Sequence, residues 1–274
     1  MIILTAANAD IAKDDFGRVY KNFSYRGVIQ ETIKKAKECG YKPVVYDLGS
    51  LGMGKQFHIK IKDKTFATKG YYEKEVQKGY KSKSLFKPEI VKFCMKEHND
   101  FTVYLDGDAQ LCANIDTIVN DDYDIGVTLR DPYEFESQWY KDHIDIVRYV
   151  NAGVIFFNPT PATKIFLNVW QKMTEEAGND QKALNKLTCP DQYPEVSSVH
   201  TINGVRIKYF SGKKYNYYYF KKGLEPNIKI YHFKGDVRHF YPFNWKKRLY
   251  CKAITPLLNK GKHLMKKVFS FKAR

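Results

Sequence analysis

The sequence lacks the features that mark zinc ribbons, redox dithiols and membrane-spanning proteins. Its 274 residues include five cysteines, an odd number, and no Cys-x-x-Cys pair, so neither a zinc ribbon nor a dithiol redox site is indicated. No apolar run approaches the roughly 20 residues of a membrane-spanning helix. The first seven residues have no basic lead and are typical of a strand rather than a signal peptide. We therefore expect reduced cysteines and a cytoplasmic protein.

Acidic residues are absent from the last 29 positions, 246–274, which contain ten lysines and arginines. The whole chain has 46 basic and 30 acidic side chains and a formal net charge of +16. The preceding 245 residues therefore carry a net charge of only +6. A basic field over the whole protein would favour a nucleic-acid partner, whereas a basic end favours contact between that end and an anionic surface.

The rest of the composition is that of a folded globular protein, with 43% hydrophobic and 28% charged residues. At roughly 100–200 residues per domain, the chain is one large domain or two fused halves. Apolar runs alternate with helical patterns in the first half, which predicts an α/β fold with a mostly parallel sheet covered on both faces. The strands that we expect are 2–7, 43–47, 101–105, 124–129, 149–157, 205–210 and 228–233.

Three helices are predicted between these strands. Ser24 is the expected N-cap of the first, and Gly40 is the residue expected just past its end. Pro88 fits the first turn of the second helix. The third covers 162–177 and is amphipathic. Its expected inward side chains are Ile165, Phe166, Val169 and Met173.

The clearest chemical signal follows the apolar strand 101–105, where Asp106-Gly107-Asp108 begins. Ligands of open α/β sheets bind at the carboxyl ends of strands. Residues i and i+2 of an extended chain point the same way, so both carboxylates can face one site. Converging carboxylates repel each other unless a cation lies between them, and a hard divalent ion meets that need. Gly107 leaves room for a phosphate or sugar, although acidic pairs in turns are also common without any ligand.

Three later segments each have a structural explanation of their own. The segment around Asn151 reads as a buried strand with a glycine at a crowded backbone. Asp180-Gln181 reads as a helix start with Asp180 as the N-cap. His232 ends a strand, where a histidine is more often packed or capped than bound to a ligand.

Taken in order and spacing, these segments resemble the signature series of glycosyltransferases of the GT-A fold. The motifs are Leu-Asp-Gly-Asp, Asn-Ala-Gly-Val-Ile-Phe-Phe-Asn, Asp-Gln-x-x-Leu-Asn and His-Phe-x-Gly-x-x-Arg. Within that fold they are most similar to family 8, the lipooligosaccharide galactosyltransferases and glycogenin-like enzymes, and Phe86-Lys87-Pro88 also fits. The resemblance spans roughly 2–245. It implies a Rossmann-like mixed sheet flanked by helices, with a nucleotide-binding half 1–108 and an acceptor half 109–245.

The resemblance also implies roles for individual residues. Asp106, Asp108 and His232 would hold a metal, and oxygen ligands combined with an imidazole suit Mn²⁺ better than Mg²⁺. Asp180 and Gln181 would act at the donor sugar, with Gln181 near the anomeric carbon. The other nucleotide-sugar contacts would come from Ala6, Asn8, Asp10, Lys87, Gly107, Asn151, Lys234, Gly235 and Arg238. Uridine is the favoured base, and guanosine and cytidine remain open because the segment after the histidine motif departs from the family pattern.

The stereochemical course is not fixed by the sequence. Family 8 enzymes retain the anomeric configuration and need no general base at the acceptor hydroxyl. An inverting enzyme would need a carboxylate there, and Asp131, Glu134, Asp180 and Asp191 are eligible. We favour retention because Gln181, a poor base, falls at the motif position nearest the reacting carbon.

The basic tail 246–274 alternates apolar and lysine residues, as interfacial helices do. We expect it to contact an anionic membrane surface, placing the enzyme on the inner face of the cell membrane near a glycan or glycolipid acceptor. The alternative is a solvated end packed on its own domain. Two other functions stay open. A nucleic-acid-binding module would explain the basic charge, and a nucleotidyltransferase would share the sheet and the acidic pair, but neither accounts for the four motifs together.

Overall fold

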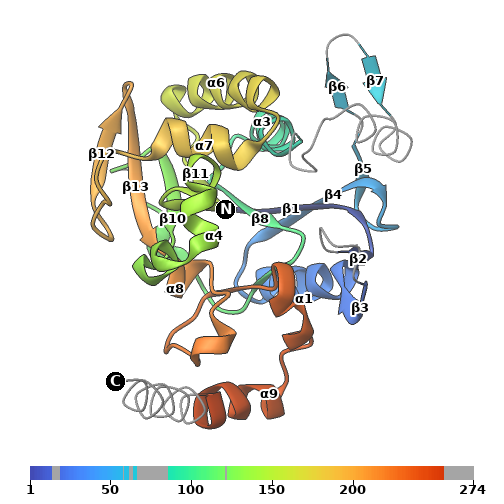
Figure 1. The fold of residues 1–274 in the computed structure, drawn as a ribbon. Coiled ribbons are helices and arrows are strands. Elements are labelled where there is room, and N and C mark those ends of the chain that lie inside the picture. Colours follow the sequence, from blue (N-terminus) through green and yellow to red (C-terminus); the bar gives the residue numbers. More distant parts are fainter. Residues whose placement is uncertain (14–18, 58, 62–63, 67–85, 121, 256–274) are drawn as a thin grey trace, which may run out of the picture.

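A computed structural model of the chain describes residues 1–13, 19–57, 59–61, 64–66, 86–120 and 122–255 (Figure 1). Its centre is an eight-stranded sheet in the order β12-β13-β10-β11-β8-β1-β4-β5. The strands are β1 Ile2–Ala9, β4 Lys42–Ser50, β5 Lys55–Gln56, β8 Thr102–Asp106, β10 Ile125–Leu129, β11 Val150–Phe157, β12 Val199–Ile202 and β13 Val205–Ser211. All run parallel to β1 except β11 and β12. The α/β fold with a mixed sheet is thus confirmed.

Helices cover both faces of this sheet, as Figure 1 shows. Helix α1 (Tyr25–Glu38) lies on one face, and α3 (Lys87–His98), α6 (Pro161–Ala177) and α7 (Asp180–Thr188) lie on the other. Side chains of a strand alternate between the faces. Ile3 of β1 accordingly packs in the core with Ala36 of α1, whereas Ile2 and Leu4 pack in the core with Trp170 of α6.

The helix boundaries follow from local chemistry. Ser24 caps α1 by accepting a hydrogen bond from the backbone N–H of Gly27, as predicted. Gly40 lies just past the C-cap with φ +75°, a conformation that favours glycine. Pro88 lies in the first turn of α3.

The predicted inward face of α6 was partly wrong. Ile165 and Val169 are exposed, at 64% and 40% of their surface. The helix buries a stripe rotated by about one residue, because Trp170 is the large side chain that packs against Phe157 of the sheet. The buried residues of that stripe are Thr163, Phe166, Leu167, Trp170 and Thr174.

Besides the cores on the two faces of the sheet, a separate core of aromatic side chains lies beside it, where β9 (Ala109–Leu111) pairs with β14 (Ile230–His232). Helix α9 (Trp245–Leu249) and a π-helical turn (Tyr250–Ile254) follow. The remaining elements are β2 Ile11–Lys13, β3 Val19–Ser24, β6 Ile59–Ile61, β7 Lys64–Phe66, η1 Asp116–Ile118, η2 Pro132–Glu136, α4 Gln138–Asp142, α5 Ile144–Val147, α8 Gly212–Tyr215, η3 Phe220–Lys222 and η4 Gly235–Phe240.

Most of the predicted tail, 256–274, lies outside the described residues. Among the helices described, none has the length and apolarity needed to cross a membrane.

The strand directions bring distant segments to one edge of the sheet. Strand β11 runs antiparallel to β8, with Val154 opposite Leu105. It therefore begins at the edge where β8 ends, so Asn151 and Asp106 come from opposite ends of their strands to the same place.

Candidate active site

Three potential metal ligands converge at the end of β8. Asp106 ends that strand, Asp108 follows one residue later, and His232 ends β14. Their ligand atoms all lie within 4.8 Å of one another. The Nε2 atom of His232 lies 3.2 Å from Asp108 Oδ1 and 3.9 Å from Asp106 Oδ2. Two carboxylates and an imidazole form a donor set that a divalent transition metal accepts.

The orientation of His232 is set by Asn216, which is fully buried. The Asn216 amide nitrogen donates to Thr128 Oγ1 (2.8 Å) and Asn151 Oδ1 (3.1 Å), which turns its oxygen toward His232 Nδ1 at 2.7 Å. His232 therefore donates its Nδ1 proton to Asn216. In the neutral imidazole the Nε2 lone pair then faces the carboxylates, so a proton or a cation must lie between them. The three side chains thus fit a metal ion.

Gly153 makes the space for the imidazole. A β-carbon added there would lie 2.2 Å from His232 Cε1, 2.7 Å from Nδ1 and 3.0 Å from Asn151 Oδ1. Real β-carbons do not approach other atoms so closely, and the ring is held by its hydrogen bond to Asn216. The glycine of the second motif is therefore needed for close packing beneath the candidate metal ligand.

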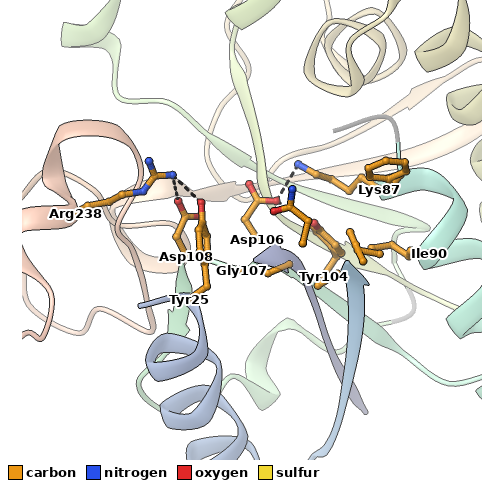
Figure 2. A pocket seen from close by; sticks show the side chains of 13 residues that line it. Tyr25, Lys87, Ile90, Tyr104, Asp106, Gly107, Asp108 and Arg238 are labelled. Carbon is orange, nitrogen blue, oxygen red and sulfur yellow. Dashed lines mark hydrogen bonds and ion pairs between the residues drawn. The ribbon is translucent and has the colours of Figure 1, made fainter. Parts of the chain in front are cut away.

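Positive charge offsets the acidic pair from two sides (Figure 2). Arg238 of η4 donates to Asp108 Oδ2 (2.8 Å) and to the hydroxyl of Tyr25 (3.1 Å). Burial by itself would raise the pKa of Asp108, but His232 and Arg238 outweigh burial and hold that pKa below its usual value. Asp108 is therefore ionised, with Oδ1 facing His232 and Oδ2 facing Arg238.

Lys87 is the second cation, and it joins three elements. Its ammonium lies 3.0 Å from Asp106 Oδ1, 2.8 Å from Asp180 Oδ2 and 3.0 Å from the carbonyl oxygen of Ala152. Burial would lower the pKa of Lys87, but the two carboxylates outweigh it and raise that pKa above its usual value. The charged lysine fixes the start of α7 against the C-terminal end of β8 and the start of β11.

A cavity of about 250 Å³ opens beside these residues. Seven of its lining residues were predicted as nucleotide, sugar or metal contacts, namely Ala6, Asn8, Lys87, Asp106, Gly107, Asp108 and Arg238. Asp10 does not line this cavity. It accepts hydrogen bonds from the Ser24 hydroxyl and the Arg26 backbone N–H at the start of α1.

Gly107 lines this cavity and is closely confined. A β-carbon there would lie 2.9 Å from the carbonyl oxygen of Ala6 and 3.1 Å from the ring of Tyr25. The acidic turn can therefore pack against β1 and α1 only without a side chain at this position.

Of the fourth motif, Arg238 lines the cavity, whereas His232, Lys234 and Gly235 do not. Lys234 is half-buried, and its ammonium lies 3.4 Å from the ring centroid of Tyr218. Burial, together with the nearby Arg130, lowers the pKa of Lys234 to about 7. Gly235 is exposed with φ +57° and begins η4, the element that brings Arg238 to the cavity.

The predicted N-cap of α7 was wrong. Asn179 is the cap and accepts from the backbone N–H of Lys182. Asp180 is the first helical residue, which leaves its carboxylate for the ion pair with Lys87. Gln181 bridges the start of β11, because its amide donates to the carbonyl of Val150 and accepts from the N–H of Ala152.

Three residues of the site were missed in the sequence. Asn216 is the single amide in an aromatic run from Tyr215 to Phe220, and that isolated polar residue was the available signal. Tyr25 contacts Arg238, and Tyr104 donates to Asp106 Oδ1 at 3.0 Å. Neither tyrosine has a sequence signature, because each lies within an ordinary helix start or apolar strand.

A family match and two solved structures relate this chain to known proteins. The sequence pattern of the nucleotide-diphospho-sugar transferase family matches residues 55–237, more than half of the chain. Comparison with curated protein sequences gives no match. A solved glycosyltransferase involved in glycosylation of the major capsid of PBCV-1 aligns with a TM-score of 0.51 at 12% identity, covering 86% of this chain and 97% of that chain. The galactosyltransferase LgtC, solved with donor and acceptor sugar analogues, aligns with a TM-score of 0.47 at 15% identity, covering 91% of this chain and 94% of that chain.

The likeness to the PBCV-1 enzyme concerns the fold and agrees with a GT-A-like arrangement. The family match concerns the sequence, and it covers the acidic pair, the Asn151 and Asp180 motifs and His232. It favours a glycosyltransferase over a nucleic-acid-binding module or a nucleotidyltransferase. The chain belongs to the nucleotide-diphospho-sugar transferase family and is a glycosyltransferase that uses a nucleotide-sugar donor.

Proposed function

We propose that the protein transfers a hexose from a UDP-sugar to a surface glycan or lipid-linked oligosaccharide, with Mn²⁺, or Mg²⁺, held by Asp106, Asp108 and His232. The observation that carries this proposal is the convergence of the three ligand atoms within 4.8 Å at the edge of the sheet. A bound divalent ion would supply positive charge to the two phosphates of the donor and stabilise the leaving diphosphate.

The residues around the cavity divide into two groups in this proposal. Arg238 would bind the phosphates, since a guanidinium matches phosphate oxygens in a bidentate fashion. Gly107 would let a phosphate approach the backbone. The end of β1, at Ala6 and Asn8, would border the nucleoside, with Asp10 keeping the start of α1 in place. Lys234 and Gly235 would complete the phosphate side of the site.

The donor sugar would lie on the other side, where Lys87 joins Asp106 to Asp180. Asn151 would contact the sugar, and Gln181 would lie near the anomeric carbon. In this division, residues 1–108 form the nucleotide-binding half and residues 109–245 form the acceptor half.

Retention of the anomeric configuration is supported by the state of the carboxylates. Three of the four carboxylates eligible as a base for inversion are held in ion pairs, at 2.5 to 3.3 Å from their cations, whereas Asp191 is fully exposed and lies 3.9 Å from Arg148. The three pairs are Asp131–Lys213, Glu134–Arg130 and Asp180–Lys87. Proton NMR of the fresh product would give the configuration of the new linkage, and an inverted product would refute this part of the proposal.

The donor is identified by thermal unfolding with UDP-, GDP- and CMP-sugars, each with and without Mn²⁺. A ligand at one hundred times its Kd stabilises a protein by about 2.7 kcal/mol. We expect a clear rise in Tm with UDP-sugars and Mn²⁺ together, and a much smaller rise without the metal. The absence of a shift with any nucleotide-sugar would refute the proposal.

Contact with an anionic membrane surface is supported by the start of the basic tail. Trp245 and Leu249, four residues apart on α9, are 69% and 55% exposed, and Tyr250 is 42% exposed. Basic residues surround these apolar side chains at Lys246, Lys247, Arg248 and Lys252. Exposed apolar groups with lysines and arginines are the elements of interfacial membrane binding. We therefore place the enzyme at the inner face of the cell membrane.

A further inference from the structure

A second cavity, of about 1060 Å³, lies behind the candidate metal ligands. Tyr231 and His232 are successive residues of β14, and successive side chains of a strand point to opposite faces. His232 faces the carboxylates, whereas Tyr231 lines this second cavity. The two cavities share no lining residue. One short strand therefore separates the second cavity from the candidate metal group.

The walls of the second cavity carry a surplus of positive charge. They include the basic residues Lys213, Lys222, Arg248 and Lys252, and the acidic residue Glu225. Lys213 pairs with Asp131 at 2.5 Å and lies 3.9 Å from Glu225. Within the described part of the chain, no carboxylate lies within 4.0 Å of the other three cations. Three positive groups thus remain available to an anionic ligand.

Aromatic rings form much of the remaining wall. Four tyrosines line the cavity: Tyr133 is half-buried, whereas Tyr217, Tyr219 and Tyr231 are at most 6% exposed. The Lys222 ammonium lies 4.7 Å from the ring centroid of Tyr133, so a cation and a flat apolar surface stand side by side. Ligand sites typically combine apolar and aromatic walls with a few polar groups that fix the ligand. A sugar that bears a negative group matches both parts of this wall.

We propose that this cavity binds the phosphate-bearing part of the acceptor, as a sugar phosphate or as the phosphate that links a glycan to its lipid. The inference rests on the proposed function, in which the acceptor is a glycan or lipid-linked oligosaccharide. Arg248 and the two lysines bind the phosphate, and the half-buried ring of Tyr133 packs against the attached sugar. The chain's own segment 256–274 is not a suitable occupant, because it has six basic and no acidic residues and the cavity is itself basic.

The test compares two single variants of the full chain with the wild type. Lys222→Ala removes an exposed cavity cation outside the basic tail, and Lys164→Ala removes an exposed lysine from α6 as a control. Glucose 1-phosphate is titrated into each protein in the presence of saturating UDP and Mn²⁺, which occupy the donor site. Binding to neutral vesicles and to vesicles that contain phosphatidylglycerol is measured in parallel.

We expect the cavity variant to lose about tenfold in affinity for at least one of the two probes, and the control variant to match the wild type. Loss of glucose 1-phosphate binding identifies a soluble sugar phosphate, and loss of phosphatidylglycerol binding alone identifies a lipid-borne phosphate. Equal affinities of the cavity variant and the wild type for both probes would overturn the proposal. Hydrolysis of UDP-hexose with Mn²⁺ is measured separately. Its absence in the wild type refutes the proposed function, whereas the cavity variant should hydrolyse at the wild-type rate.

Discussion

At the scale of single residues, the site depends on the neighbours of its candidate metal ligands. Asn216 turns His232 toward the carboxylates and is itself held by Thr128 and Asn151. Groups that orient a metal ligand in this way fix its tautomer and raise its basicity. In the proposed metal site, the affinity would thus be set by positioning residues as well as by the three ligands.

Replacing Asn216 with alanine should therefore weaken Mn²⁺ binding by about 10- to 100-fold, the range found for partners of metal ligands. The imidazole would lose its hydrogen-bond acceptor and could rotate or change tautomer. Calorimetric titration of Mn²⁺ in the presence of UDP measures the effect. Asn216→Gln tests whether any amide is sufficient, and unchanged Mn²⁺ affinity in Asn216→Ala would contradict this role.

Gly153→Ala should displace His232, because the new β-carbon would lie 2.2 Å from the imidazole. Overpacking of a tight core costs about 1–3 kcal/mol of stability. We expect a folded protein, by circular dichroism, with Mn²⁺ affinity at least tenfold weaker. A variant that binds Mn²⁺ like the wild type would show that the ring can move without leaving the metal.

At the scale of elements, Asp124 ties three of them together on the sheet. It immediately precedes β10 and accepts hydrogen bonds from the Arg206 backbone N–H and guanidinium on β13. It also accepts from the hydroxyl of Thr160, the N-cap of α6. Burial would raise the pKa of Asp124, but these donors, Arg206 first, lower it below its usual value.

Asp124→Asn should lower the free energy of unfolding by about 2 kcal/mol at pH 7, because hydrogen bonds to a buried charge are lost. The unfolded pKa is about 3.9 and the folded pKa is lower, so the contribution is fully present above about pH 4. It decreases as pH falls through the folded pKa. Urea unfolding at pH 7 and pH 3 should show a smaller difference from wild type at pH 3.

The exposed pair Asp122–Lys208 provides the matched control. Asp122 is 43% exposed, and exposed pairs contribute about 0–1 kcal/mol. Asp122→Asn should therefore change stability little at either pH. An equal effect of Asp124→Asn at both pH values would contradict the account of the buried carboxylate.

The positions of the helices and strands could be predicted from the sequence better than the contacts between them. The apolar run before Asp106 marked β8, and the serine and glycine at the ends of α1 marked its boundaries. The antiparallel course of β11 could not be read, because an apolar run has the same pattern in either direction. For the same reason the placement of Asn151 beside Asp106 came from the motif resemblance and not from the strand pattern. The predicted inward face of α6 was partly wrong because Ile165 and Val169 also follow a helical spacing. Only packing against the sheet selects the stripe that contains Trp170.

At the scale of the whole molecule, charge is divided between the body and the tail. The first 245 residues have a net charge of +6 and contain the acidic pair of the proposed metal site, whereas the last 29 residues hold ten of the 16 excess charges. The position of the charge, more than its amount, therefore favours an anionic surface at one end.

Removal of residues 256–274 should leave hydrolysis of UDP-hexose intact and weaken binding to anionic vesicles. Each lysine or arginine near such a surface contributes about 1 kcal/mol, and six are lost with this segment. Vesicle sedimentation at low and high salt measures the change. If the shortened chain binds anionic vesicles as tightly as the wild type, residues 256–274 do not contribute to membrane contact. Any contact would then be made by α9 alone.

The central claim is tested most directly by UDP-hexose turnover as a function of Mn²⁺ in the wild type, Asp106→Ala and Asp108→Ala. The account predicts turnover that requires the metal and falls by at least 100-fold in both variants, while their thermal unfolding confirms that they are folded. Turnover at the wild-type rate in either variant, or in the wild type without any divalent ion, would contradict it.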